Sequence, residues 1–230
     1  MTRYLYATDR PWALEAFSAR RAELPGTWTL VTVKADLAAA VEAVRPRYAF
    51  FPHWSHIVPE AVLAATECVC FHMTDVPYGR GGSPLQNLIA RGHRETVLTA
   101  LRMTAVLDAG PVYLKAPLSL DGPAHAIFAR MADRAIDLMA RIARDEPRPE
   151  PQPDATGQEA FARRTPAQSV LPGTATPEGI HDHIRMLDAP GYPHAYLDHG
   201  ELRITLRDAA LTPDGTVTAR ATIRRRDDGA

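Results

Sequence analysis

Several features that mark specialised classes of protein are missing from this chain of 230 residues. Its 26 basic and 27 acidic residues give a formal net charge of −1, so it has no basic surplus of the kind that supports nucleic-acid binding. No apolar run reaches the length of about 18 residues that crosses a membrane, and the charged start lacks the apolar core of a signal peptide. These absences predict a cytoplasmic protein without a nucleic-acid or membrane partner.

Cysteine and metal-ligand patterns are also scarce. The two cysteines, Cys68 and Cys70, lie two residues apart in an apolar run, too close in sequence to form an ordinary disulfide. His53 and His56 are spaced like a metal-binding pair, but no third ligand follows them at helical spacing. GxGxxG and P-loop patterns are absent as well. We therefore expect no metal and no phosphate cradle of these types.

The chain does contain an alternation of short apolar runs with helical patterns. Strands are predicted at residues 4–7, 28–33, 48–51 and 69–72, and helices at 11–21, 37–44 and 60–65. This order predicts an α/β fold with a Rossmann-like, mostly parallel sheet flanked by helices. Ligands of such sheets bind at the carboxyl ends of the strands, where His53 and His72 fall.

The sequence that follows these elements predicts a second, smaller subdomain. A helix from about residue 123 ends before Pro147, and its apolar residues keep the helical spacing of a core face (Ile127, Met131, Leu138, Ile142). Alternate prolines then indicate an extended segment. We expect a main domain at residues 1–146, a Pro-rich connector at 147–176 and a small C-terminal α+β subdomain at 177–230. Arginines near the end read as a solvated tail, because two aspartates follow them (Arg220, Arg224, Arg225, Arg226; Asp227, Asp228).

A histidine and an aspartate are the strongest candidates for chemistry. His72 ends a predicted strand and is followed by a Pro/Gly loop at residues 77–82, while Asp108 lies in the turn Leu-Asp-Ala-Gly-Pro. A strand-end histidine is more often structural, and a turn aspartate often satisfies its own backbone. The loop favours the functional interpretation, since glycine lets backbone approach a ligand closely. Asp108 would then orient the imidazole of His72.

Three segments together resemble the folate-dependent formyltransferases. They are the strand and turn at residues 50–59, the loop and helix start at 72–86, and the turn at 107–112, within a match from about Tyr48 to Lys115. Segments 161–166 and 184–193 are similar to the tail of small-molecule members, in particular sugar-type ones. The resemblance implies transfer of a formyl group from 10-formyltetrahydrofolate to an amine. It further implies that His72 stabilises the oxyanion and assists proton transfer while Asp108 holds His72.

One position departs from the family pattern. The family usually has Asn-x-His, whereas this chain has Cys70 two residues before His72, and a thiol is a weak hydrogen-bond donor. Three explanations stay open: Asn87 reaches into the site, backbone N–H groups of Gly81 and Gly82 replace the amide, or formyl transfer is slow or absent. A nucleophilic Cys70 is a further alternative, because His72 lies on the same face of the strand.

The resemblance also implies where the ligands bind. The donor pocket would be lined by the turn after the third strand and by the segment before Asp108 (Phe51, Trp54, Ile57, Val58, Val106, Leu107). Trp54 is either a stacking wall or a packing residue. The acceptor would meet the loop after His72 (Tyr78, Arg80, Gly81, Gly82). Arg80 would pair there with a phosphate or carboxylate, or else hold the loop through a salt bridge.

The sequence therefore predicts an N-formyltransferase acting on a small primary amine, such as a nucleotide-linked amino sugar or an amino acid derivative. Two alternatives remain: a hydrolase that releases formate from the same donor, and a folate-binding protein without turnover. Sugar-type relatives often form dimers, so a homodimer is also expected, although no patch identifies its interface.

Overall fold

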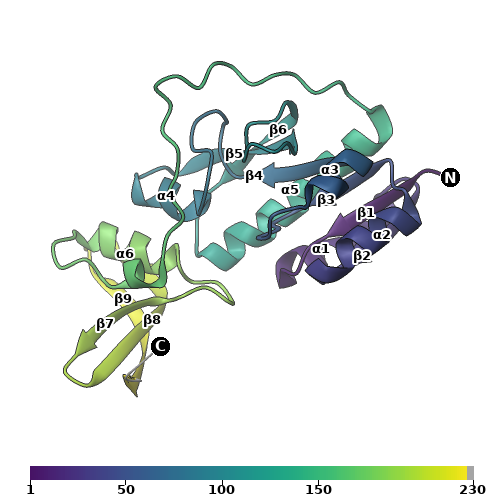
Figure 1. The fold of residues 1–230 in the computed structure, drawn as a ribbon. Helices are drawn as coiled ribbons and strands as arrows, with labels where there is room; N and C mark the ends of the chain where they lie inside the picture. Colours follow the sequence, from purple (N-terminus) through teal and green to yellow (C-terminus); the bar gives the residue numbers. More distant parts are fainter. Residues whose placement is uncertain (227–230) are drawn as a thin grey trace. The chain divides into compact units, whose positions relative to one another are not determined.

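The computed structural model describes residues 1–226, which form two compact units (Figure 1). The sheet unit comprises residues 1–84, 95–119 and 128–161. The C-terminal unit comprises residues 85–94, 120–127 and those from 162 onward. Each unit thus collects segments that are far apart in the chain. The domain boundaries expected at 146 and 176 stay predictions.

A six-stranded sheet forms the centre of the sheet unit, in the order β2-β1-β3-β4-β5-β6. The first four strands of that order pair in parallel, and β5 and β6 are antiparallel. The α/β class predicted from the sequence is confirmed, as a mixed sheet with flanking helices. Its strands are β1 (Arg3–Ala7), β2 (Thr27–Val31), β3 (Tyr48–Phe51), β4 (Glu67–His72), β5 (Glu95–Arg102) and β6 (Val112–Ser119).

Helices connect the strands and cover the sheet. The predicted helix at residues 37–44 and the predicted helix at 60–65 have the bounds that the sequence pattern indicates. The helices are α1 (Pro11–Arg20), α2 (Leu37–Val44), α3 (Glu60–Ala65), α4 (Pro84–Ala90), α5 (Ala124–Asp145) and α6 (Pro177–Arg185), with short 3₁₀ turns η1 (Arg21–Glu23), η2 (Lys34–Asp36) and η3 (Pro166–Ser169). Along residues 1–226, no helix is both long enough and apolar enough to cross a bilayer.

Alternation along β1 gives the sheet two different buried faces. Leu5 and Ala7 belong to a cluster that also contains residues of α2 and α3. Tyr6 lies on the other face, where its ring stacks on Phe17 of α1 at 4.2 Å and its hydroxyl donates to the Ala13 carbonyl at 2.8 Å. A period of two therefore sends alternate side chains into two cores, as expected for a central strand. The core face predicted for α5 is also confirmed, with the four named side chains at most 1% exposed.

The C-terminal unit contains a three-stranded antiparallel sheet in the order β7-β8-β9. Its strands are β7 (Ala195–His199), β8 (Leu202–Leu211) and β9 (Val217–Arg225). The arginines expected in a solvated tail are exposed, but they do not form an irregular tail, because Arg220, Arg224 and Arg225 lie within β9 and pair with β8. Strand propensity of the alternating Val, Thr and Ile residues outweighs the charges there. Asp227 and Asp228 lie outside the described residues.

Candidate active site

His72 and Asp108 lie together in the sheet unit. His72 ends β4, and Asp108 lies in the turn between β5 and β6. The Nδ1 atom of His72 is 3.5 Å from Oδ2 of Asp108, and the two side chains are 7% and 9% exposed. Burial lowers the local dielectric and so strengthens such a contact relative to one at the surface. The two sequence segments therefore supply one buried pair of titratable groups.

The imidazole of His72 has an oxygen acceptor near each of its nitrogens. Its Nε2 lies 2.8 Å from the carbonyl oxygen of Gly79. A carbonyl oxygen only accepts hydrogen bonds, so Nε2 must carry a proton in this arrangement. The carboxylate of Asp108 faces Nδ1 at 3.5 Å, so a proton on Nδ1 would be stabilised by the neighbouring negative charge. The geometry thus suits an imidazole that holds and exchanges protons under the control of a fixed carboxylate.

Asp108 is itself held by backbone. Its Oδ2 accepts a hydrogen bond of 3.0 Å from the N–H of Gly81. Its own backbone has a φ of 51°, which side chains other than glycine rarely adopt, although Asp and Asn tolerate it. The carboxylate is therefore oriented by a loop that follows His72 in sequence and by the turn in which it lies.

The glycines of that loop make room for the protein's own connector. A Cβ added to Gly81 would lie 2.3 Å from the carbonyl oxygen of Phe161, and one added to Gly79 would lie 2.7 Å from the Phe161 ring. Tyr78 packs edge-on against the same ring, with centroids 5.3 Å apart. The glycine pattern indicated that another group lies close to this backbone. That group is Phe161 of the connector, which is 4% exposed. Roles for Tyr78, Gly81 and Gly82 in acceptor binding stay predictions.

Cys70 is a free and partly buried cysteine. Burial, and then the negative charge of Asp108, raises the pKa of the Cys70 thiol well above its usual range. A nucleophilic mechanism needs a thiolate, so this environment argues against the covalent alternative. A protonated thiol offers only a weak S–H donor where the family has an amide.

Asn87, proposed above as a replacement donor, belongs to α4 in the C-terminal unit. Its Nδ2 donates to the Ala162 carbonyl at 3.0 Å, and its Oδ1 accepts from Nη1 of Arg91 at 3.0 Å. These contacts give the side chain a structural purpose within its own unit. Its role in catalysis stays a prediction.

The residues expected to line the donor pocket fall into two groups. Phe51 and Val58 are 1% and 5% exposed and belong to the core cluster, so only their backbone can face a ligand. Trp54 packs against the same cluster, with its ring 5.9 Å from that of Phe51. Exposure is high for the other three apolar side chains, at 78% for Ile57, 66% for Val106 and 61% for Leu107.

Polar residues that were not among the predicted site residues gather after β1 and β3. Nη2 of Arg10 donates to the hydroxyl of Ser55 at 2.7 Å, and Nε2 of His56 lies 3.6 Å from Asp9. These loops follow two adjacent parallel strands that lead to opposite sides of the sheet, which is where α/β folds bind ligands. From the sequence, this rule indicated only His53 and His72, because Asp9 and Arg10 immediately precede the helix predicted at residues 11–21.

The side chain of His53, just after β3, packs against Trp12 and Phe128. Nε1 of Trp12 donates to its Nδ1 at 3.2 Å, and its ring lies 4.6 Å from that of Phe128. Burial, followed by the positive charge of Arg10, lowers the pKa of His53 to about 3. The ring is therefore neutral at ordinary pH and contributes no charge to a site.

Arg80 contacts the connector instead of an acidic residue. Its Nε and Nη2 atoms donate to Oε1 of Gln152 at 3.0 and 2.6 Å. Gln152 in turn donates to the turn that contains Asp108. A single glutamine among prolines carries no sequence signal for such a role, and this residue was not among the predicted site residues. Acceptor binding by Arg80 stays a prediction.

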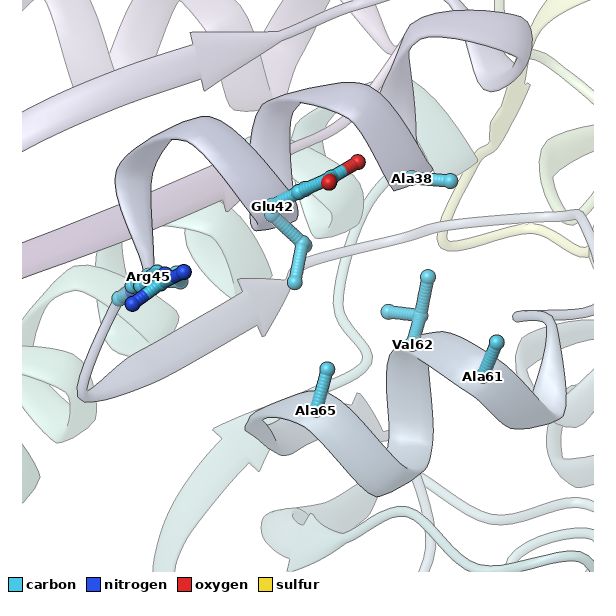
Figure 2. Close-up of a pocket in the computed structure, with 8 residues that line it drawn as sticks. Ala38, Glu42, Arg45, Ala61, Val62 and Ala65 are labelled. Atoms are coloured by element: carbon cyan, nitrogen blue, oxygen red, sulfur yellow. The ribbon is translucent and has the colours of Figure 1, made fainter.

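A hollow of about 440 Å³ lies between α2 and α3 (Figure 2). Its walls are mostly small or apolar, with one acidic and one basic side chain (Ala38, Val41, Glu42, Arg45, Pro46, Ala61, Val62, Ala65). It contains none of the residues predicted to bind donor or acceptor, and it offers no acid–base pair comparable to His72 and Asp108.

The chain is similar to known proteins in both sequence and structure. Residues 166–224 match the model of the methionyl-tRNA formyltransferase C-terminal domain. A methionyl-tRNA formyltransferase of Halorhodospira halophila is 30% identical over 204 residues, which cover 85% of this chain and 62% of the relative. The chain therefore spans less than two thirds of that relative's length.

Two solved structures are also similar. A methionyl-tRNA formyltransferase from Clostridium thermocellum is 34% identical, with a TM-score of 0.93, over 98% of this chain and 100% of that one. HypX from Aquifex aeolicus in complex with tetrahydrofolic acid is 17% identical, with a TM-score of 0.74, over 90% of this chain and 37% of that one. The second likeness shows the fold alone.

The expectation of a small-molecule amine and no nucleic-acid partner is contradicted by these relatives, because those that are at least 30% identical are methionyl-tRNA formyltransferases. The net charge misled because it sums over the whole chain, whereas a binding surface depends on the local arrangement of charge. Since a solved relative is 34% identical along its full length, this chain belongs to the family of folate-dependent formyltransferases.

Proposed function

We propose that this protein transfers the formyl group of 10-formyltetrahydrofolate to the amine of a methionyl-tRNA. The observation that carries the proposal is the buried pair of His72 and Asp108, 3.5 Å apart, within a chain that resembles a methionyl-tRNA formyltransferase along its whole length. The acceptor is taken from the names of the relatives, and the donor from the family.

The chain's own contribution to this reaction is proton transfer. The donor supplies a formyl group on a nitrogen that can leave. As the amine forms its bond to the formyl carbon it loses one proton, and the departing nitrogen gains one as its bond breaks. In this proposal the reacting atoms take the position that the Gly79 carbonyl oxygen occupies beside Nε2 of His72. His72 then transfers the proton through Nε2, and Asp108 keeps the ring in place. Such acid–base groups contribute roughly 10²–10⁴ in rate.

Exposed apolar side chains support the expected donor site. Ile57, Val106 and Leu107 are each more than half exposed, although leaving such side chains in water forgoes about 25 cal/mol for every Å² of apolar surface left unburied. Val106 and Leu107 come immediately before Asp108 in the chain. A partly apolar ligand that covers this segment would place its reactive end near the carboxylate. The described residues therefore fit a folate-type donor.

One face of the C-terminal sheet supports a tRNA acceptor. In β8 and β9, Arg203 lies opposite Arg224, and Arg207 lies opposite Arg220. Directly opposed residues of antiparallel strands share a face, as do residues four apart along a strand. The four guanidinium groups are therefore on the same side of the sheet. We call this side the arginine face, defined by Arg203, Arg207, Arg220 and Arg224.

Aspartates partly neutralise the arginine face. Arg203 contacts Asp198 through two hydrogen bonds of 2.8 and 3.0 Å, and Arg220 contacts Asp208. The guanidinium of Arg203 also lies 3.8 Å above the ring of Tyr196, a cation–π contact. Arginines held in place and more than 40% exposed suit phosphate contacts, because phosphates accept the same bidentate hydrogen bonds as carboxylates.

The decisive experiment measures conversion of 10-formyltetrahydrofolate to tetrahydrofolate with methionyl-tRNA, free methionine, uncharged tRNA or no acceptor, with His72→Ala as the control. Turnover with methionyl-tRNA alone, abolished in His72→Ala, is the expected result. Formate release in the absence of any acceptor would show a hydrolase. Donor binding without turnover in any mixture would show a binding protein and refute the proposal.

A further inference from the structure

Gln152 lies in the extended connector and makes four hydrogen bonds that link two loops of the active site. Its Nε2 donates to the carbonyls of Asp108 and Gly110 at 2.8 and 2.7 Å. Its Oε1 accepts two bonds from Arg80, at 3.0 and 2.6 Å. Both amide hydrogens and the amide oxygen are thus fully used.

The partners permit only one orientation of this amide. Carbonyl oxygens only accept, so the NH₂ group must face Asp108 and Gly110. A guanidinium only donates, so the amide oxygen must face Arg80. No charged or apolar side chain of similar length satisfies both sides. A glutamine is therefore the residue that these two loops require.

These contacts close a ring around the Asp108 carboxylate. Gln152 holds the backbone of Asp108, the Asp108 carboxylate accepts from the N–H of Gly81, and the neighbouring Arg80 returns to Gln152. The turn has little freedom elsewhere, because a Cβ on Gly110 would lie 1.7 Å from the Arg102 carbonyl oxygen. Movement of Gln152 would therefore shift the carboxylate relative to His72.

The connector is fastened on both sides of Gln152. Glu150 and Val112 exchange two backbone hydrogen bonds of 2.7 and 2.8 Å. Phe161 donates to the Arg80 carbonyl at 2.7 Å and accepts from the Gly82 N–H at 2.8 Å. In Figure 1 this stretch appears as a long segment without helix or strand, yet its contacts hold the side chain of Gln152 at a defined place.

We propose that Gln152 is a positioning residue, which sets the Asp108 carboxylate against His72 and acts on the reaction only through that pair. The inference rests on the proposed function for its kinetic consequences, but its structural consequence is independent of it. A change at Gln152 should alter the environment of His72 whether or not the substrate has been identified correctly.

Two substitutions test the proposal. Gln152→Glu keeps the size and the contact with Arg80 but replaces the donors facing Asp108 and Gly110 with an acceptor. Gln152→Met keeps the length and removes both kinds of hydrogen bond. Gln158→Glu is the matched control, since Gln158 is an exposed connector residue whose backbone N–H bonds to Ala155. Each variant is checked for folding by circular dichroism and thermal unfolding.

Two readouts are needed. We expect both Gln152 variants to lower kcat by about 10- to 100-fold with the KM for the donor unchanged, because small misplacements of catalytic groups cost rates of this size. We also expect the ¹⁵N signals of the His72 ring, assigned by their absence in His72→Ala, to move in both variants and not in Gln158→Glu.

The proposal is overturned if folded Gln152 variants keep the wild-type His72 signals. It is also overturned if both variants lose the folded structure, since Gln152 would then serve general stability. If the wild-type protein transfers no formyl group, the proposed function fails, and the His72 signals alone decide the role of Gln152.

Discussion

The active site and the arginine face hold their charged groups in opposite ways. His72 and Asp108 are less than 10% exposed, and their partners are backbone groups and Gln152. Arg203, Arg207 and Arg220 of the C-terminal sheet are more than 40% exposed and pair with aspartates of the same unit. Buried groups are screened little by salt, whereas exposed ones are screened strongly. The first arrangement suits directed proton transfer, and the second suits exchangeable contact with a polyanion.

The largest effect is expected at the buried pair. His72→Ala and Asp108→Asn should each lower kcat by roughly 10²–10⁴, because they remove or misplace the proton-transfer group. Steady-state kinetics with methionyl-tRNA measure the effect, and His199→Ala on the exposed end of β7 is the control. Full activity of His72→Ala would show that the buried pair of His72 and Asp108 has no chemical role.

A smaller effect is expected on the arginine face. The double variant Arg220→Ser/Arg224→Ser should raise the KM for tRNA by about tenfold. It should also reduce the dependence of log KM on log salt by about one for each phosphate that the protein no longer binds. The KM for the donor should not change. Arg141→Ser/Arg144→Ser on the exposed side of α5 is the charge-matched control. Equal effects of the two double variants would show that only net charge matters.

The burial of His53 predicts that the stability of the protein depends on pH. The pKa of His53 is about 3 in the folded protein, against an ordinary value of 6.5, chiefly because burial disfavours the charged ring. Between these values the unfolded chain binds a proton that the folded one does not, so stability falls as pH drops from about 6.5 towards 3. Urea unfolding at pH 7.5 and 4.5 should show a smaller change in His53→Asn than in wild type. Asparagine tolerates the positive φ of 56° and retains an acceptor for Trp12. An unchanged pH dependence in this variant would assign the effect to other groups.

The smallest effect is expected at an exposed ion pair. Asp198→Asn removes the carboxylate that contacts Arg203 at 2.8 Å and Arg226 at 3.5 Å. Exposed pairs contribute little to stability, so the unfolding midpoint should not change measurably. The KM for tRNA should instead fall a few-fold, because the arginine face becomes more positive. A rise in this KM would mean that Asp198 orients Arg203 for its contact with tRNA.

Local patterns determined much of the fold in advance. The bounds of α2, α3 and β3 follow from the sequence pattern, because Ala-rich and apolar runs are interrupted there by residues that favour turns. β7 was not predicted, since it is short and follows a segment rich in proline and glycine. It forms a strand because it pairs with β8, and that pairing is not visible locally.

The α/β class, the family resemblance and the choice of His72 and Asp108 as candidates could be predicted from the sequence, since each depends on patterns within short continuous segments. Three features became evident only in the folded structure: the contacts of Phe161 and Gln152 with the loops around Asp108, the raised pKa of the Cys70 thiol, and the position of four arginines on one face. Hydrogen bonds, burial and strand register depend on which distant segments meet, and local patterns do not contain that information.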